Sequence, residues 1–312
     1  MNNFSNQFLS CDWGTSSFRL RLIDATSLEI KKEVSNDQGI ALTYNQWLAT
    51  GKPESERQAF YKKVLADAAM IVAKGSEGTP IILSGMASSS IGIQELPYQN
   101  FPFKWKASEL ICRKIDDDET LPYPLYLVSG MRVAKDIMRG EETILLGCPG
   151  AGRHGVYIFP GTHSKHIILE DGMAIDFKTY MTGEVFNLMN KESILKNSME
   201  PGEDAVAFEA GVRDAERENL LSNLFAIRVN QVLGNSTPIS NYQFLSGLVI
   251  GTELNDLKGY SPTMFGLVGD GPLLEAYKMA MHILGMKNVY VTSAATALIK
   301  GHSKIYNSLV ND

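Results

Sequence analysis

Cysteine is scarce in this chain. Among 312 residues there are three, Cys11, Cys112 and Cys148, and none is spaced as Cys-x-x-Cys or set beside histidine as in a zinc site. A disulfide framework and a structural zinc site are therefore not expected. Such low cysteine content is typical of proteins from a reducing compartment, so the sequence predicts a cytoplasmic protein.

Long apolar runs and basic character are also lacking. No run approaches the ~18 apolar residues of a membrane-spanning helix, and the first seven residues lack the basic-then-apolar order of a signal peptide. The 29 basic and 35 acidic side chains give a net charge of −6, which leaves no broad basic surface for nucleic acid. We expect neither membrane nor nucleic acid as a partner, whereas a small anionic ligand in a local pocket is compatible with this charge.

What the sequence does contain is the composition of a globular protein with a sizeable core, with 44% apolar and 21% charged residues. The length suits two domains. Strand and helix patterns are mixed in both halves, so the expected class is α/β, built from two similar units. We predict domains over residues 1–132 and 133–312, with the last helix free to pack back on the first domain. A cluster of glycine and proline within residues 132–155 marks the expected hinge.

Two short segments share one pattern: residues 12–19 (DWGTSSFR) and 160–165 (PGTHSK). Each follows an apolar strand pattern, turns through glycine into hydroxyl residues, and returns along a second strand. Glycine before Thr or Ser at a hairpin tip lets the backbone approach a ligand with N–H and O–H donors outward, as phosphate oxygens require. A plain hairpin would explain one such turn. Two of them, one in each half, predict two related halves that bind one nucleotide.

Charged side chains flank both turns. Asp12 could hold Mg²⁺, mostly through water, because a hard cation prefers oxygen ligands, and Arg19 could reach a transferring group. His163 and Lys165 could neutralise phosphate, or be a structural hydrogen-bonding group and a solvated cation. The nucleotide contacts expected from the two turns are Gly14, Thr15, Ser16, Arg19, Gly161, Thr162, His163, Ser164 and Lys165.

A third glycine-rich turn lies in residues 266–274 (GLVGDGPLL), between a strand pattern and a helix pattern. A purine or ribose can lie against such a backbone, and the helix N-terminus favours anions. Many strand-to-helix connections contain glycine, so this turn alone is weak evidence for a nucleotide site. The prediction is supported by its position in the same half of the chain as the second phosphate-type turn. We expect Gly269, Asp270 and Gly271 to contact the nucleoside.

Phosphoryl transfer to an alcohol requires a carboxylate within hydrogen-bond reach of the attacking hydroxyl. The densest acidic candidate is residues 135–143 (KDIMRGEET), within a helix predicted over 133–146. A solvated helix face is the plain alternative. Gly140 inside a helix costs about 1 kcal/mol relative to alanine, which suggests the close approach of another group.

A polar loop follows the buried strand pattern at residues 80–83. It could bind a polyhydroxylated substrate, or it could be an ordinary Ser/Gly loop. The residues we expect to contact substrate here are Gly85, Met86, Ser88, Glu95 and Tyr98.

Taken together, these strings resemble the 2-dehydro-3-deoxygalactonokinases, a sugar-acid kinase family of the actin-like ATPase superfamily. The resemblance covers nearly the whole chain and rests chiefly on Met138–Thr143 (MRGEET) and Pro160–Lys165 (PGTHSK). It implies two ribonuclease-H-like domains, with ATP and Mg²⁺ in the cleft between them. The implied reaction moves the γ-phosphate to the terminal hydroxyl of 2-dehydro-3-deoxygalactonate, giving the 6-phosphate. The first turn would meet the γ-phosphate, the second the β/γ region, and the Gly269 turn the adenosine.

The resemblance also implies a base among residues 136–142. We favour Glu141 as the base, with Asp136 next, and Asp12 as a third catalytic residue and the metal ligand. Where the family pattern has Gly, Ser and Arg after Gly85-Met86, this chain has residues 87–90 (ASSS), so this segment lacks a basic residue for the substrate carboxylate.

Two alternatives stay open. The chain could be a kinase for another sugar or 2-keto sugar acid, or a nucleotide-binding sensor without sugar turnover. The partner is expected to be a small sugar acid, and a homodimer would be usual for a cytoplasmic sugar kinase.

Overall fold

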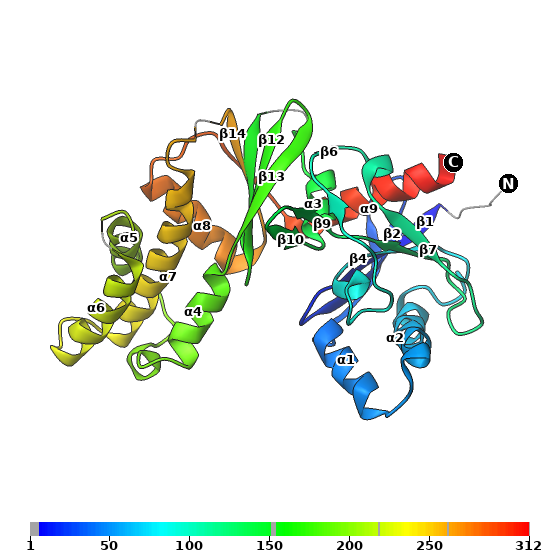
Figure 1. The fold of residues 1–312 in the computed structure, drawn as a ribbon, viewed down its shortest axis with the longest axis horizontal. Helices are drawn as coiled ribbons and strands as arrows, with labels where there is room; N and C mark the ends of the chain where they lie inside the picture. Colours follow the sequence, from blue (N-terminus) through cyan, green and yellow to red (C-terminus); the bar gives the residue numbers. More distant parts are fainter. Residues whose placement is uncertain (1–5, 151–153, 218, 261, 312) are drawn as a thin grey trace. The chain divides into compact units, whose positions relative to one another are not determined.

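The structure is a computed structural model that describes residues 6–150, 154–217, 219–260 and 262–311. Residues 151–153 of the predicted hinge lie outside the described residues. The chain divides into two compact units, drawn in Figure 1. Unit 1 comprises Met1–Gly152, Gly172–Ile175 and Ala294–Asp312, and unit 2 comprises Arg153–Asp171 and Asp176–Ser293. Residues 133–150, which the sequence analysis assigned to the second domain, are grouped with unit 1.

Unit 1 is built on a six-stranded sheet. The strands lie in the order β3-β2-β1-β4-β8-β7. The first three strands of the chain form an antiparallel meander, and β4 and β8 then run parallel to β1. Their bounds are β1 Gln7–Trp13, β2 Phe18–Asp24, β3 Ile30–Asn36, β4 Ile81–Gly85, β7 Cys112–Ile115 and β8 Leu125–Val128.

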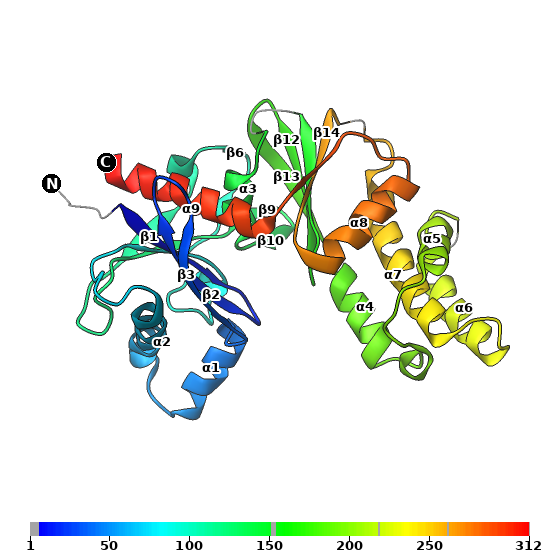
Figure 2. The ribbon, with the colours of Figure 1, turned by 180° about the vertical axis from the view of Figure 1, so that it is seen from behind.

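The two faces of this sheet carry different helices, α1 (Ile40–Ala49) and α2 (Arg57–Val72) on one side and α9 (Ala294–Asn311) on the other (Figures 1 and 2). Side chains alternate along β1, so one set joins the core against α2. The other set begins with Phe8, whose ring stacks on Tyr306 of α9 with centroids 5.3 Å apart. Ser10 follows in this row and bonds to His302 of α9. Asp12 is the last residue of the row, near the carboxyl end of β1.

Residues 131–147 do not form the helix predicted over 133–146, and that prediction is wrong. Instead β9 (Met131–Val133) and β10 (Asp136–Met138) make a hairpin, to which β5 (Gln99–Asn100) adds a parallel strand. The helix α3 begins only at Glu141 and ends at Gly147. Gly140 has φ +106°, a value that favours glycine, so it makes the sharp turn from strand to helix instead of lying inside a helix.

The sheet of unit 2 repeats the arrangement of unit 1. Read from β13, its strands lie in the order β13-β12-β11-β14-β15, with three antiparallel strands followed by two that run parallel to the first. Unit 1 has the same order, β3-β2-β1-β4-β8. The predicted α/β class with two ribonuclease-H-like units is confirmed. The bounds are β11 Gly155–Phe159, β12 Ser164–Glu170, β13 Met173–Tyr180, β14 Met264–Val268 and β15 Val289–Thr292; β6 (Phe103–Lys104) pairs with Met173 and Ala174.

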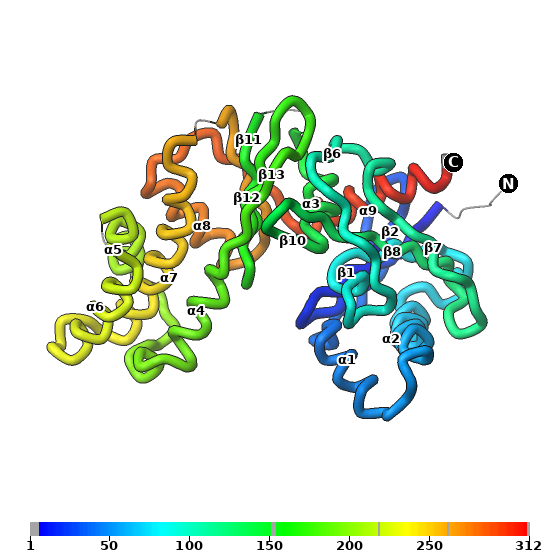
Figure 3. The backbone as a smooth tube through the Cα atoms, viewed as in Figure 1, coloured from blue at the N-terminus to red at the C-terminus, as the bar shows by residue number. Residues whose placement is uncertain are grey.

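Helix α7 (Pro238–Leu254) lies among the other helices of unit 2 and contacts α4, α5, α6 and α8 (Figure 3). It meets α5 backbone to backbone, because a Cβ on Gly247 would come within 2.1 Å of the Phe208 carbonyl oxygen. The neighbouring helices are α4 Thr182–Lys191, α5 Ala205–Asp214, α6 Leu220–Val232 and α8 Gly271–Ile283. Across the described ranges, no helix has both the length and the hydropathy to cross a bilayer.

Candidate active site

Asp12 occupies the end of β1 between two polar neighbours. It pairs in register with Arg19 on β2 and with Ser84 on β4. Burial raises the pKa of the Asp12 carboxyl, Arg19 and Arg21 partly oppose this rise, and the charge of Glu141 adds to it. The carboxylates of Asp12 and Glu141, 129 positions apart in the chain, therefore lie close enough to repel each other.

Two glycines bring the backbone together beside Asp12. Gly85 ends β4 with φ +92°, and a Cβ on it would lie 2.8 Å from the Trp13 carbonyl oxygen and 3.6 Å from Oδ1 of Asp12. A Cβ on Gly140 would lie 3.4 Å from the Cα of Gly85. The end of β1, the end of β4 and the start of α3 thus meet at one place. The structure gathers there the predicted residues Asp12, Gly85 and Glu141.

Glu142 has a different place from Glu141. Its side chain is 1% exposed, and both of its carboxylate oxygens accept from the Gly140 amide, at 3.0 and 2.8 Å. The Thr143 hydroxyl donates to it as well. Burial, with a further contribution from Glu141, raises the pKa of Glu142 to about 8. Glu142 therefore holds the first turn of α3, while Glu141, which is partly exposed, is the acidic residue of the pair that a ligand can reach.

Asp136 does not share an element with Glu141. It lies on β10, where it pairs with Val133 across the hairpin, and its Oδ1 accepts from the Ile137 amide at 2.7 Å. Asp136 and Glu141 therefore do not lie on one helix, as the helix predicted over 133–146 implied.

Two of the five predicted substrate residues, Ser88 and Tyr98, contact a side chain that was not predicted from the sequence, that of Arg139. Arg139 donates from Nη1 to the Ser88 hydroxyl at 2.7 Å, and its guanidinium lies over the ring of Tyr98, 4.0 Å from the centroid. Ser88 is buried, Met86 is partly buried and Glu95 is exposed. The only sequence signal for Arg139 was its position inside the MRGEET string.

Unit 2 contains a cavity of about 770 Å³, within the ~300–1,000 Å³ usual for small-ligand sites. Gly161 and Thr162 of the second turn line it, and so does Pro272, which follows the predicted Gly269–Gly271 turn. Asp270 precedes α8 as its N-cap residue, and α8 begins at Gly271. The cavity thus brings the second phosphate-type turn and the start of α8 to one site. Its aromatic and larger apolar lining residues are Phe186, Phe208, Tyr242, Val249, Ile250, Leu273, Tyr277 and Met279.

The second turn is packed tightly against α4. A Cβ on Gly183 would lie 2.6 Å from the Gly161 carbonyl oxygen, and the Glu184 amide donates to the Thr162 carbonyl. Nε2 of His163 is 2.5 Å from Oε2 of Glu184. Lys165 Nζ donates to the His163 carbonyl at 3.0 Å. Both side chains therefore have structural contacts beside any role toward phosphate.

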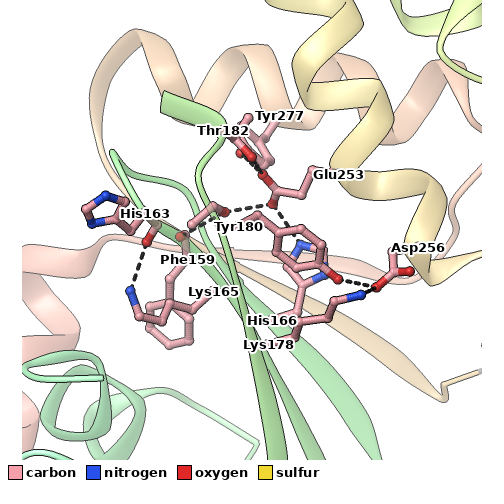
Figure 4. A network of polar contacts seen from close by, with 11 residues as sticks. Phe159, His163, Lys165, His166, Lys178, Tyr180, Thr182, Glu253, Asp256 and Tyr277 are labelled. Carbon is pink, nitrogen blue, oxygen red and sulfur yellow. Dashed lines mark hydrogen bonds and ion pairs between the residues drawn. The ribbon is translucent and has the colours of Figure 1, made fainter. Parts of the chain in front are cut away.

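The buried carboxylate of Glu253 supports the second phosphate-type turn through side-chain hydrogen bonds (Figure 4). Glu253 of α7 is 3% exposed and accepts from four groups on β12, α4 and α8. Its partners are Ser164 Oγ at 2.7 Å, His166 Nε2 at 2.8 Å, Tyr277 OH at 2.5 Å and the Thr182 hydroxyl. Burial alone would raise the pKa of Glu253, but these hydrogen bonds outweigh burial and lower the pKa. Glu253 was not among the residues predicted from the sequence, where its one signal is an acidic residue in a largely apolar stretch.

In the part of the chain that the structure describes, no three His, Cys, Asp or Glu side chains converge as a metal cage. Mg²⁺ at phosphoryl-transfer sites generally needs fewer protein ligands, because substrate phosphates and water complete its shell. Asp12 lies near the carboxyl end of β1, and Glu141 begins α3, which starts beside Gly85 at the end of β4, so the site offers the carboxylate oxygens that a hard cation prefers. The donor set therefore fits Mg²⁺.

Comparisons with known proteins agree with one another. The family model described as 2-keto-3-deoxy-galactonokinase matches residues 12–305. The chain is 30% identical over 243 residues to the 2-dehydro-3-deoxygalactonokinase of Escherichia coli (strain K12), covering 75% of this chain and 81% of that protein. It is 32% identical over 310 residues to a protein of Rhizobium meliloti (strain 1021) named as a probable 2-dehydro-3-deoxygalactonokinase, covering 95% of each. The crystal structure of a Sinorhizobium meliloti protein described as a putative 2-dehydro-3-deoxygalactonokinase matches with a TM-score of 0.82 at 30% identity, covering 97% of this chain and 99% of that one.

Proposed function

The chain belongs to the 2-keto-3-deoxy-galactonokinase family, and from that premise we propose that it transfers the γ-phosphoryl group of ATP to the terminal hydroxyl of 2-dehydro-3-deoxygalactonate. It is a sugar-acid kinase. The observation that supports this reaction best is the meeting of Asp12, Gly85 and the start of α3 at Glu141. A pair of acidic residues at this place suits an alcohol acceptor that must lose a proton.

Glu141 is the proposed general base. As the terminal oxygen of the sugar acid attacks the γ-phosphorus, its proton passes to the Glu141 carboxylate, and the bond from phosphorus to the β,γ-bridging oxygen breaks to release ADP. Glu142 supports this step from a distance, because its bonds to the Gly140 amide fix the first turn of α3. Asp136, the second choice for the base, lies on β10.

The nucleotide residues are proposed on both units. On unit 2, the cavity of about 770 Å³ takes the adenosine, Gly269, Asp270 and Gly271 border the nucleoside, and the second turn provides donors to the phosphates. On unit 1, the Gly14–Ser16 turn and Arg19 serve the γ-phosphate. The exposure of Thr15 and Ser16 is compatible with this role. In phosphoryl transfer, amide, hydroxyl and cationic groups of this kind stabilise the negative charge of the phosphates.

Mg²⁺ is the proposed metal, and Asp12 would hold it, chiefly through water. When bound with ATP, the ion neutralises charge on the transferring phosphates. A cytoplasmic location and a homodimer are further proposals that rest on the family resemblance alone. Sedimentation of the purified chain tests the dimer.

Coupled release of ADP tests the function. The assay supplies ATP and Mg²⁺ with a panel of 2-keto-3-deoxy sugar acids and neutral sugars. Turnover confined to 2-dehydro-3-deoxygalactonate supports the proposed substrate, and turnover of another compound keeps the kinase and rejects the substrate. Tight ATP binding with no turnover of any acceptor would reject the enzyme and favour the sensor.

A further inference from the structure

Arg139 carries a positive charge whose protein partners are all neutral. Its Nη1 donates to the Ser88 hydroxyl at 2.7 Å and its Nη2 to the Leu96 carbonyl at 3.2 Å, while Tyr98 contributes its ring face. Among the residues that the structure describes, no carboxylate forms an ion pair with Arg139. A partly buried guanidinium loses hydration, and hydroxyl and carbonyl dipoles replace only part of it. An anion is the partner that completes this environment.

The remaining donors of Arg139 match a carboxylate. A guanidinium has five N–H donors in a planar fork, and the two hydrogen bonds to Ser88 and Leu96 use two of them. The buried Nε has no hydrogen-bond partner. Contacts with Ser88, Leu96 and Tyr98 fix the plane of the Arg139 guanidinium, so the binding of a carboxylate would require little further ordering of this side chain. Arginine forks of this kind recognise carboxylate through paired hydrogen bonds.

The position of Arg139 relative to Glu141 suits the two ends of one acceptor. The residues are two apart in sequence, with Gly140 between them against Gly85. Their Cα atoms are therefore at most about 7 Å apart, since an extended chain advances ~3.3–3.6 Å per residue. Arg139 and Glu141 are therefore near enough along the chain for one sugar acid, with a carboxylate at one end and a primary hydroxyl at the other, to contact both side chains.

We infer that Arg139 binds the carboxylate of the sugar acid and so selects an acid over a neutral sugar. This inference rests on the proposed function and adds the specificity residue. Residues 87–90 contain no basic residue, and Arg139, from another part of the chain, supplies the positive charge there through its hydrogen bond to Ser88. Ser88 and Tyr98 then act as positioning residues that hold Arg139.

The test compares two acceptors in two proteins. The acceptors are 2-dehydro-3-deoxygalactonate and its carboxamide, which keeps the terminal hydroxyl and lacks the charge. Losing charged hydrogen bonds worth about 1.5–3 kcal/mol corresponds to roughly a 10- to 150-fold change. We expect Arg139→Gln to raise the KM for the acid by that factor, to leave kcat/KM for the carboxamide within about threefold, and to leave the KM for ATP unchanged. Arg139→Lys, which keeps the charge without the fork, should fall between the two.

A matched control is Arg132→Gln on the adjacent strand β9, where Arg132 is exposed and donates to Asn100. It should behave as the unsubstituted protein with both acceptors. Equal losses on acid and carboxamide in Arg139→Gln, with Arg139→Lys no better, would assign Arg139 a purely structural role and overturn the inference while the kinase stands. If the unsubstituted protein phosphorylates neutral sugars and no sugar acid, the proposed substrate fails, and the inference fails with it.

Discussion

The hydroxyl of Ser164 lies 2.7 Å from Oε1 of Glu253, across 89 positions of sequence. This bond joins the second phosphate-type turn to a helix that contains no residue of that turn. His166, Thr182 and Tyr277 donate to the same carboxylate (Figure 4). The position of the turn therefore depends on one buried acid in α7 as well as on its own glycine and hydroxyl residues.

Replacing Glu253 should loosen unit 2 and weaken nucleotide binding. Glu253→Ala leaves several buried donors without an acceptor, each at a cost of about 1–3 kcal/mol. We expect the free energy of unfolding in urea to fall by at least ~3 kcal/mol and the KM for ATP to rise. Glu209→Ala on α5, which removes an exposed pair with Arg213, is the control and should change stability by less than ~1 kcal/mol. Equal effects of the two variants would contradict the role of Glu253.

Replacing the proposed base should stop chemistry and spare nucleotide binding. Glu141→Gln keeps the shape of the side chain and removes its basicity, so we expect kcat to fall about 10²–10⁴-fold. Calorimetric affinity for a non-hydrolysable ATP analogue should be little changed. Asp136→Asn is the comparison and should retain most of the rate. The reverse result, with Asp136→Asn inactive and Glu141→Gln active, would move the base to β10.

Gly85 should tolerate no side chain. Gly85 and Gly78 have φ of +92° and +87°, but a Cβ on Gly85 would lie 2.8 Å from the Trp13 carbonyl oxygen, whereas a Cβ on Gly78 meets nothing within 4 Å. Backbone strain costs both alanine variants about 1–3 kcal/mol, and only Gly85→Ala adds the clash beside Asp12. We expect Gly85→Ala to have the lower free energy of unfolding and to lose activity. Equal stability and activity in the two variants would show that β1 and β4 can separate without consequence.

Local patterns were enough to predict the fold and to propose part of the candidate site. The apolar runs of β1 and β11, and the glycine-to-hydroxyl turns that follow them, are properties of neighbouring residues. They predicted strands, turns and two related units before any contact was known. Asp12 and Gly85 lie at such strand ends, so local patterns were enough to make both of them candidate site residues.

Features that depend on distant partners could not be predicted in the same way. Residues 133–146 have side chains that a helix accepts, but β9 pairs with β5, whose residue Gln99 is opposite Met131. Arg139 reaches Ser88 across 51 positions, and Glu253 reaches Ser164 across 89. A charge in the sequence does not reveal which neutral groups the fold will place around it. The contacts that give such residues their roles become apparent only in the folded structure.

Protonation of His302 should contribute to acid sensitivity. Its ring is buried between Ser10 Oγ, 2.7 Å from Nδ1, and Ser84 Oγ, 3.0 Å from Nε2. Burial, with a smaller contribution from Arg21, lowers its pKa from 6.5 to about 3. Between these values the unfolded chain takes up a proton that the folded chain does not, so this stabilisation is complete above pH 6.5 and is lost as the pH falls toward 3.

At 1.36 kcal/mol per pKa unit, this group should account for at most about 2 kcal/mol of stability lost between about pH 7 and pH 5. We expect His302→Gln to be less stable than the unsubstituted protein at neutral pH, because Ser10 and Ser84 lose a well-placed partner. Its free energy of unfolding should nevertheless fall less over the same pH interval, as urea titrations at each pH would measure. His282→Gln, at an exposed position on α8, should keep the pH dependence of the unsubstituted protein. If His302→Gln keeps it too, the buried imidazole is not the group that couples folding to pH.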